Sequence, residues 1–274
     1  MISYSLALAG IIGATLIPVF IALYIASNLK PLATKYIAAA GVGLTFWFFF
    51  DTMGDAAQLD VNESFTGGAA HVGIVIAFVA GISALAFFDH FAVPSQASGA
   101  IKTDRMNAPS KSLFIIPAGI ALVMGVHGFG EGWDFASAAS ATSQSLTDAF
   151  GGLGAVASYP MHKALEATIV ASVYTTFVGR NAVAFKAKWH LPVLGLLFGL
   201  PSVIGTSIGY YVSLDTTYFY AFGVTAALYA ALRLSEAVVS RSNDAEWIPA
   251  YLGGKVFLVM LLGFLLLYVA ALFH

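Results

Sequence analysis

This chain lacks several residue types, and each absence excludes a class of protein. Its 274 residues include no cysteine, which excludes a disulfide-stabilised fold, a thiolate metal site and a thiol enzyme. Only 9% of the residues are charged, against about 25% in a soluble domain, so neither a soluble globular domain nor a disordered chain fits. The formal net charge is −2 and there is no basic block, so nothing indicates nucleic-acid binding.

Hydrophobic residues instead make up 59% of the chain and form runs long enough to cross a bilayer, which takes about 20 residues of helix. The runs are continuous rather than alternating, so they predict helices and not the strands of a membrane barrel. We place eight transmembrane helices at residues 3–28, 36–58, 69–92, 113–138, 153–178, 190–212, 216–239 and 252–273. The sequence therefore predicts an all-α polytopic membrane protein, a single compact bundle that comprises residues 1–274.

The basic residues predict how this bundle lies in the membrane. Apart from Lys163 and Arg233, every lysine and arginine lies in or beside alternate connections between the predicted helices, including the loop 94–112. The opposite connections hold acidic residues and no basic ones. By the positive-inside rule, the loop 94–112 faces the cytoplasm and both termini lie outside. The absence of cysteine and of long loops favours the plasma membrane of a prokaryote.

A few ionisable residues lie inside the predicted spans, where a charge is costly unless it meets a partner, water or an ion. His127 and Glu131 are four residues apart and share one helix face, which Asp134 extends by another turn. His162 and Glu166 repeat the spacing on the next span. One such pair is more often an internal hydrogen bond, but two pairs on neighbouring helices form a common cage for a divalent metal. We therefore predict a metal site made by these four histidine and glutamate residues.

The backbone beside these residues is expected to be irregular. Gly128, Gly130 and Gly132 fall within five residues and weaken the fourth predicted helix, while Pro160 removes a backbone hydrogen bond just before His162. Broken helices that carry polar groups at mid-depth are typical of transporter binding sites.

These segments together resemble a known family. The run His127-Gly128-Phe129-Gly130-Glu131-Gly132 resembles the His-Asn-x-Pro-Glu-Gly signature of the ZIP (Zrt/Irt-like protein) metal transporters, and the stretch from Pro160 to Ala167 is similar to their fifth-span metal motif. Weaker similarity covers nearly the whole chain. The resemblance implies an inverted-repeat architecture, a binuclear site between the fourth and fifth spans, transport of zinc, iron or related ions toward the cytoplasm, and commonly a homodimer.

The resemblance also assigns roles to individual residues. His127, Glu131 and Glu166 match the primary metal position, with His162 adjacent. Asp51 and Asp55 would line the outer approach, and Asp89 and Glu236 the cytoplasmic exit; we add Gln58 and Asp134 to the outer path and His90 to the exit. From the residues alone, Asp51, Asp55 and Gln58 are equally typical of a water-filled vestibule or an outer helix end, Asp89 with His90 is more typical of a solvated helix end, and Glu236 of an ion pair with Arg233.

Departures from the family pattern change one expectation. The family's asparagine and proline are Gly128 and Gly130 here, and Lys163 takes the place that often supplies a carboxylate to the second metal. An ammonium beside Glu131 and Glu166 offsets the repulsion between the two carboxylates without a second cation. We therefore predict that one metal ion is transported rather than two.

Three hypotheses follow, of which a divalent metal transporter without enzymatic activity is favoured. Its substrate would be zinc in the first place, although iron, manganese, cobalt and cadmium suit the same ligands. A membrane-embedded metallohydrolase could use these ligands to activate water, with Glu166 or Asp134 as the base, but the chain has no His-Glu-x-x-His motif. The third hypothesis is a non-transporting fold relative, including a retinal-binding bundle whose Schiff-base lysine would be Lys163 or Lys255.

Overall fold

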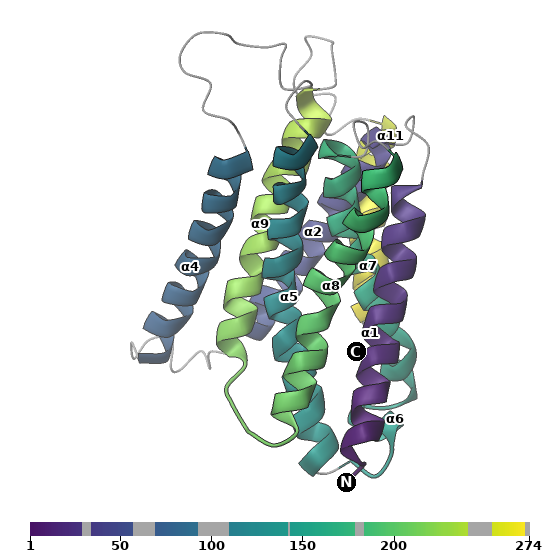
Figure 1. The fold of residues 1–274 in the computed structure, drawn as a ribbon, viewed down its shortest axis with the longest axis vertical. Coiled ribbons are helices and arrows are strands. Elements are labelled where there is room, and N and C mark those ends of the chain that lie inside the picture. Colours follow the sequence, from purple (N-terminus) through teal and green to yellow (C-terminus); the bar gives the residue numbers. More distant parts are fainter. Residues whose placement is uncertain are drawn as a thin grey trace.

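The computed structural model describes residues 1–28, 34–56, 69–92, 110–141, 143–178, 184–240 and 254–271. All regular structure in these ranges is helical, which confirms the all-α part of the predicted fold class (Figure 1). Its long helices are α1 (Tyr4–Ser27), α2 (Thr34–Ala56), α4 (Ala69–Ala92), α5 (Ser110–Ala141), α7 (Leu153–Phe177), α8 (Ala184–Gly209), α9 (Thr217–Ser240) and α11 (Gly254–Ala271). A short helix, α6 (Leu146–Ala149), precedes α7 and was not predicted.

The length of the apolar helices identifies the class of protein. Within the described residues, five helical stretches are long and apolar enough to cross a membrane: Tyr4–Ser27, Tyr36–Gly54, Phe114–Ala141, Trp189–Gly209 and Gly254–Ala271. They indicate an integral membrane protein. Helix α4 adds a shorter apolar stretch at Val72–Phe88. Helix α7 is more polar, and many of its residues are buried against neighbouring helices rather than exposed to lipid.

The helices pack in two groups around a central pair, α5 and α7. On one side, α1 packs against α7 and α8, and α8 runs along α5. On the other side, α9 contacts α2 and α4, and α11 packs against α2. Helices α5 and α7 also cross between the groups, because α5 contacts α9 and α7 contacts both α2 and α11. Polar residues on α5 and α7 are therefore enclosed by helices from both sides.

Helix α5 is one continuous helix through its three central glycines, so the predicted break there is wrong. The glycines serve close packing instead. A methyl group on Gly132 would collide with the backbone of Ser202 on α8, and one on Gly125 would collide with the backbone of Leu197. Thr206 on α8 donates a hydrogen bond to the carbonyl of Gly132 at 2.9 Å. Packing against α8 thus keeps this segment helical, although its glycines favour a helix only weakly.

Helix α7 likewise continues through Pro160, so the second predicted break is also wrong. Its start is fixed by a turn in which Gly151 (φ 94°) and Gly152 (φ 123°) adopt backbone conformations that favour glycine. From this turn α7 runs antiparallel to α5, so His162 and Glu166 reach the level of the central glycines of α5.

The two ends of the bundle differ in charge. The chain begins at one end, where the connection 210–216 joins α8 to α9 (Figure 1). Helices α2, α5, α8 and α11 all begin at the opposite end (Figure 1). The first turns of these four helices hold basic residues, namely Lys35, Lys111, Lys186 and Lys255.

Candidate metal site

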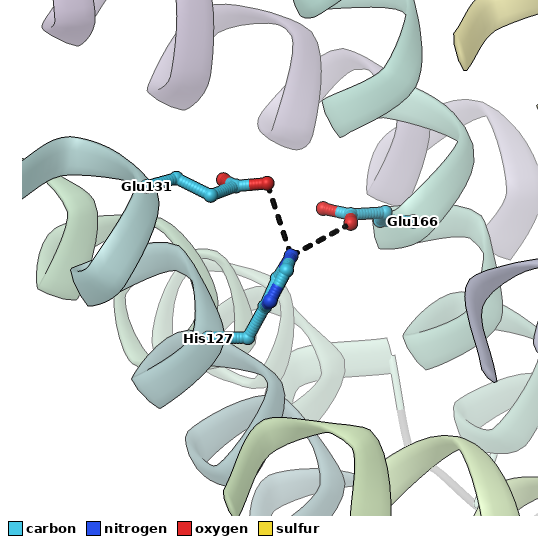
Figure 2. Close-up of side chains that lie close together, drawn as sticks. All are labelled: His127, Glu131 and Glu166. Atoms are coloured by element: carbon cyan, nitrogen blue, oxygen red, sulfur yellow. Dashed lines mark ion pairs between the residues drawn. The ribbon is translucent and has the colours of Figure 1, made fainter. Parts of the chain in front are cut away.

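The central feature of the bundle is a buried group of three side chains from α5 and α7. His127 and Glu131 come from α5, and Glu166 comes from α7 (Figure 2). The Nε2 atom of His127 lies 3.0 Å from Glu131 Oε1 and 3.6 Å from Glu166 Oε1. One ligand atom from each of the three residues lies within 4.8 Å of the others, and all three are buried. Among the described residues, this is the group with the spacing that a metal ion needs.

The ring of His127 is held in a fixed position. The edge-on rings of Phe48 from α2 and Tyr220 from α9 each lie 5.0 Å from it, measured between centroids. Among the described residues, Nε2 is paired with the two carboxylate oxygens and Nδ1 makes no hydrogen bond, although His127 is almost completely buried. An imidazole nitrogen directed between two carboxylate oxygens can also serve as a cation ligand.

His162 lies beside this group rather than inside it. Its Nε2 atom lies 3.0 Å from Glu166 Oε1 and 4.0 Å from Asp51 Oδ2. The same oxygen of Glu166 therefore faces both histidines. The structure brings the four predicted ligands together, but Nε2 of His162 contacts Glu166 and lies near Asp51 instead of facing His127 and Glu131.

Lys163 faces the same two carboxylates from the opposite direction. Its ammonium contacts Oε2 of Glu131 and lies 2.5 Å from Oε2 of Glu166, and the side chain is fully buried. Tyr159 donates a further hydrogen bond to Glu131 Oε2 at 3.2 Å. Each carboxylate thus has one oxygen directed to the ammonium and the other to a histidine.

A cavity of about 580 Å³ connects the site with one end of the bundle. Its inner wall includes His127, Glu131 and His162, and its outer rim includes the exposed residues Leu214 and Asp215. The complete lining among the described residues is Asp51, His127, Glu131, Asp134, His162, Leu214, Asp215, Thr216, Thr217, Tyr220 and Ala271. The rim lies at the end where the chain begins, so the cavity opens there and not at the basic end.

Carboxylates are distributed along the wall of this cavity. Asp134 lies one turn beyond Glu131 on α5 and accepts hydrogen bonds from Thr216 at 2.9 Å and from the Tyr220 hydroxyl at 2.7 Å. Asp51 projects from α2 beside His162 and is partly exposed. With Asp215 at the rim, these groups form a polar route from the surface to the buried histidines.

The remaining predicted path residues are less well defined. Asp55, Asp89 and Glu236 lie on described helices, but their side chains are outside what the structure describes, and Gln58 is outside the described residues. His90 is exposed near the end of α4. Lys255, one of the two lysines considered for a Schiff base, is exposed at the start of α11 and away from the cavity lining.

Sequence reasoning missed the aromatic residues of the site. Tyr220 touches both His127 and Asp134, Tyr159 touches Glu131, and Phe48 packs against His127. The chain contains 22 phenylalanines and 12 tyrosines, so no single ring could be picked out by composition. The i,i+4 spacing of Thr216 and Tyr220 at the start of a predicted span was the only available signal.

No model of a known protein family matches the chain, and no curated protein matches its sequence. The fold and the site therefore define the class: an all-helical integral membrane protein with a buried histidine–glutamate group that could hold a metal ion.

Proposed function

We propose that this protein carries a divalent metal ion across the membrane, toward the cytoplasm. The observation that carries the proposal is the buried group His127, Glu131 and Glu166 at the inner end of an acidic cavity. Ionisable groups at membrane depth are costly and mark ion pathways by default. A simple anchor or scaffold has no need for two carboxylates and two histidines between its central helices.

The ligand set indicates the substrate class. One imidazole nitrogen and two carboxylate oxygens suit zinc first, and iron, manganese, cobalt or cadmium as well. The absence of thiolates makes very tight retention less favourable, which suits a carrier that must release its ion. Because Lys163 occupies the other side of both carboxylates, the proposed substrate is one ion at a time.

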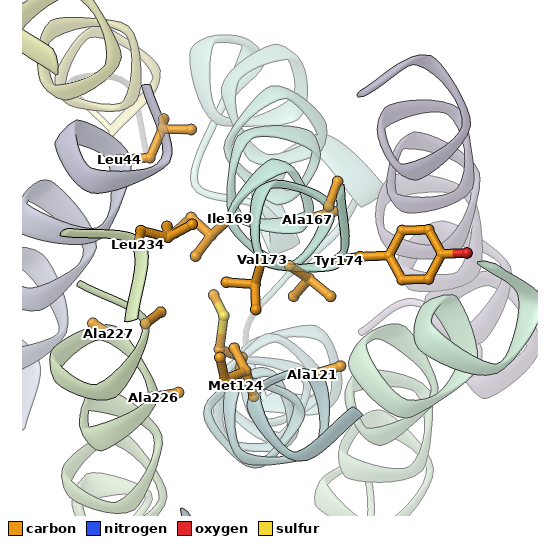
Figure 3. Close-up of a cluster of buried hydrophobic side chains, with 14 of the residues drawn as sticks. Leu44, Ala121, Met124, Ala167, Ile169, Val173, Tyr174, Ala226, Ala227 and Leu234 are labelled. Carbon is orange, nitrogen blue, oxygen red and sulfur yellow. The ribbon is translucent and has the colours of Figure 1, made fainter. Parts of the chain in front are cut away.

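Within the described residues, the cavity gives the proposed ion a path from one end of the bundle. Asp215, Asp134 and Asp51 line the route and would raise the local concentration of cations. On the opposite side of the site, residues from α2, α5, α7 and α9 form a fully buried apolar cluster that includes Leu44, Met124, Ile169, Val173 and Leu234 (Figure 3). An ion cannot cross this cluster unless the helices move. Alternating access would therefore require one helix group to shift against the other.

Charge asymmetry supports an orientation for this path. The cavity opens at the end opposite Lys35, Lys111, Lys186 and Lys255, which under the positive-inside rule supports a mouth that faces the outside of the cell. We propose that all eight long helices span the membrane, the more polar α7 being shielded by its neighbours. The resemblance to ZIP transporters supports the same orientation, and adds the inverted repeat, the homodimer and the prokaryotic plasma membrane as further proposals.

A flux assay tests the proposal. Proteoliposomes that contain the wild type should accumulate Zn²⁺ down its gradient, while His127→Ala and Glu166→Gln should lose most of this uptake. Lys255→Ala, an exposed position at the start of α11, is the control and should transport as the wild type does. Equal uptake by all four proteins, or none by the wild type, would show that the proposal is wrong.

A metallohydrolase remains a second candidate because of one observation: the cavity of about 580 Å³ is much larger than a metal ion requires. Against the metallohydrolase, both candidates for its general base already have partners. Glu166 is engaged by Lys163 and both histidines, and Asp134 accepts hydrogen bonds from Thr216 and Tyr220. Zn²⁺-dependent cleavage of a casein or phospholipid substrate, without Zn²⁺ flux, would favour this candidate over transport.

A further inference from the structure

The two oxygens of each buried glutamate have different partners. Oε1 of Glu131 and Oε1 of Glu166 face His127, whereas Oε2 of both residues contacts the ammonium of Lys163. The cavity lining includes the two histidines and Glu131, while Lys163 has no exposed surface. A metal ion arriving through the cavity would therefore meet the Oε1 side, with the ammonium fixed behind the carboxylates.

This arrangement determines the charge that an arriving ion meets. If both carboxylates are ionised, the ammonium of Lys163 cancels one of their two negative charges. The rings of Tyr159 and Phe198 lie 5.7 Å and 5.8 Å from the ammonium and keep it away from water. Screening by solvent is weak at such a position, so the ammonium opposes a divalent cation strongly.

We propose that Lys163 is a tethered cation that weakens metal binding enough for the ion to be released. The inference rests on the proposed transport function and concerns its affinity and rate. Without Lys163, two uncompensated carboxylates would hold Zn²⁺ much more tightly, and an ion held too tightly cannot leave. With Lys163, the carboxylates keep a cationic partner on their Oε2 side after the metal leaves, so release does not leave them uncompensated.

Two substitutions remove the charge in different ways. Lys163→Met keeps most of the side-chain volume, and Lys163→Gln can still donate hydrogen bonds to both carboxylates. Both leave buried carboxylates with less compensation, so either variant is expected to be less stable without metal. Lys255→Met is the matched control, because it removes the same charge at an exposed position.

The experiment compares binding and rate in the same preparations. Zn²⁺ affinity is measured by equilibrium dialysis against buffered Zn²⁺, and initial Zn²⁺ uptake is measured at saturating concentration in proteoliposomes. We expect Lys163→Met and Lys163→Gln to bind Zn²⁺ about tenfold or more tightly than the wild type and to transport it correspondingly more slowly. Zn²⁺ should also raise their melting temperatures more than that of the wild type, a readout that works even where the metal-free variant folds poorly.

The outcomes separate this inference from the proposed function. If the wild type transports Zn²⁺ but neither Lys163 variant binds it more tightly, Lys163 is only a structural partner and the inference is wrong, while the transport proposal stands. If the wild type neither binds nor transports Zn²⁺, the transport proposal fails and the inference fails with it. If only the Lys163 variants bind Zn²⁺, the ammonium excludes the ion instead of tuning its release, which also overturns the inference.

Discussion

His127 on α5 and Glu166 on α7 approach each other to 3.6 Å between Nε2 and Oε1, between the central helices of the bundle. The contact joins two antiparallel helices that are both buried among neighbours from opposite sides of the molecule. A histidine nitrogen and a carboxylate oxygen at this separation can both coordinate one ion. The predictions below depend on this relationship and on the residues that surround it.

Removing the imidazole should weaken metal binding directly. His127→Ala deletes the nitrogen that faces both carboxylates, so its Kd for Zn²⁺ should rise at least about tenfold, since loss even of an outer-shell partner costs 10–100-fold. Equilibrium dialysis with detergent-purified protein measures the change. His90→Ala, at an exposed position near the end of α4, is the comparison for loss of a histidine elsewhere. An unchanged Kd in His127→Ala would remove this residue from the site.

Tyr220 should act through the position of His127 and not as a ligand. Tyr220→Phe keeps the ring that packs against His127 and loses the hydrogen bond to Asp134, so Zn²⁺ affinity should change little. Tyr220→Leu removes the ring and should weaken binding severalfold. If the phenylalanine variant is as impaired as the leucine variant, the hydroxyl and not the ring supports the site.

Asp134 should affect the capture of the ion more than its movement through the protein. Asp134→Asn removes a negative charge from the cavity wall, so the KM for Zn²⁺ uptake should rise while the maximal rate stays similar. The KM should also become less sensitive to ionic strength, because the cavity wall then carries one charge fewer that salt can screen. Asp148→Asn, outside the cavity lining, serves as the control. A loss of maximal rate with unchanged KM would place Asp134 in a later step.

The packing of α5 against α8 predicts a stability effect at one glycine. Gly132→Ala introduces a methyl group against the backbone of Ser202, which should destabilise the protein by about 1–3 kcal/mol. Gly13→Ala on α1 has open space around it and should be neutral or slightly stabilising. Thermal unfolding in detergent compares the two variants. Equal melting temperatures would mean that α5 and α8 are not closely packed at Gly132.

The sequence predicted the helices well because hydrophobic length and loop composition are local properties. The predicted span 69–92 has the bounds of α4, and α7 differs from its predicted span by a single residue at its end. Helix α8 begins at Ala184, six residues before the predicted span 190–212, because its first turns are too polar to be recognised as membrane-spanning. The prediction of membrane spans locates the apolar part of a helix and does not locate its first residue.

The site could be predicted only as far as spacing allows. The i,i+4 spacing placed His127 with Glu131 and His162 with Glu166, and neighbouring spans suggested that the pairs meet. Spacing could not show that Lys163 takes the Oε2 side of both glutamates, or that His162 faces Asp51. Glycines were interpreted as breaks because local propensity cannot anticipate that Gly132 lies against another helix. These features depend on how helices pack, which the pattern along one helix does not encode.

The most direct test of the account is the location of a bound metal by anomalous X-ray scattering from Zn²⁺-soaked crystals. We predict one anomalous peak, between His127 Nε2, Glu131 Oε1 and Glu166 Oε1, on the side of the carboxylates away from Lys163. Loss of that peak in His127→Ala crystals would assign it to this site. Crystals without a peak at this position, with Lys163 still bridging both glutamates, would contradict the account.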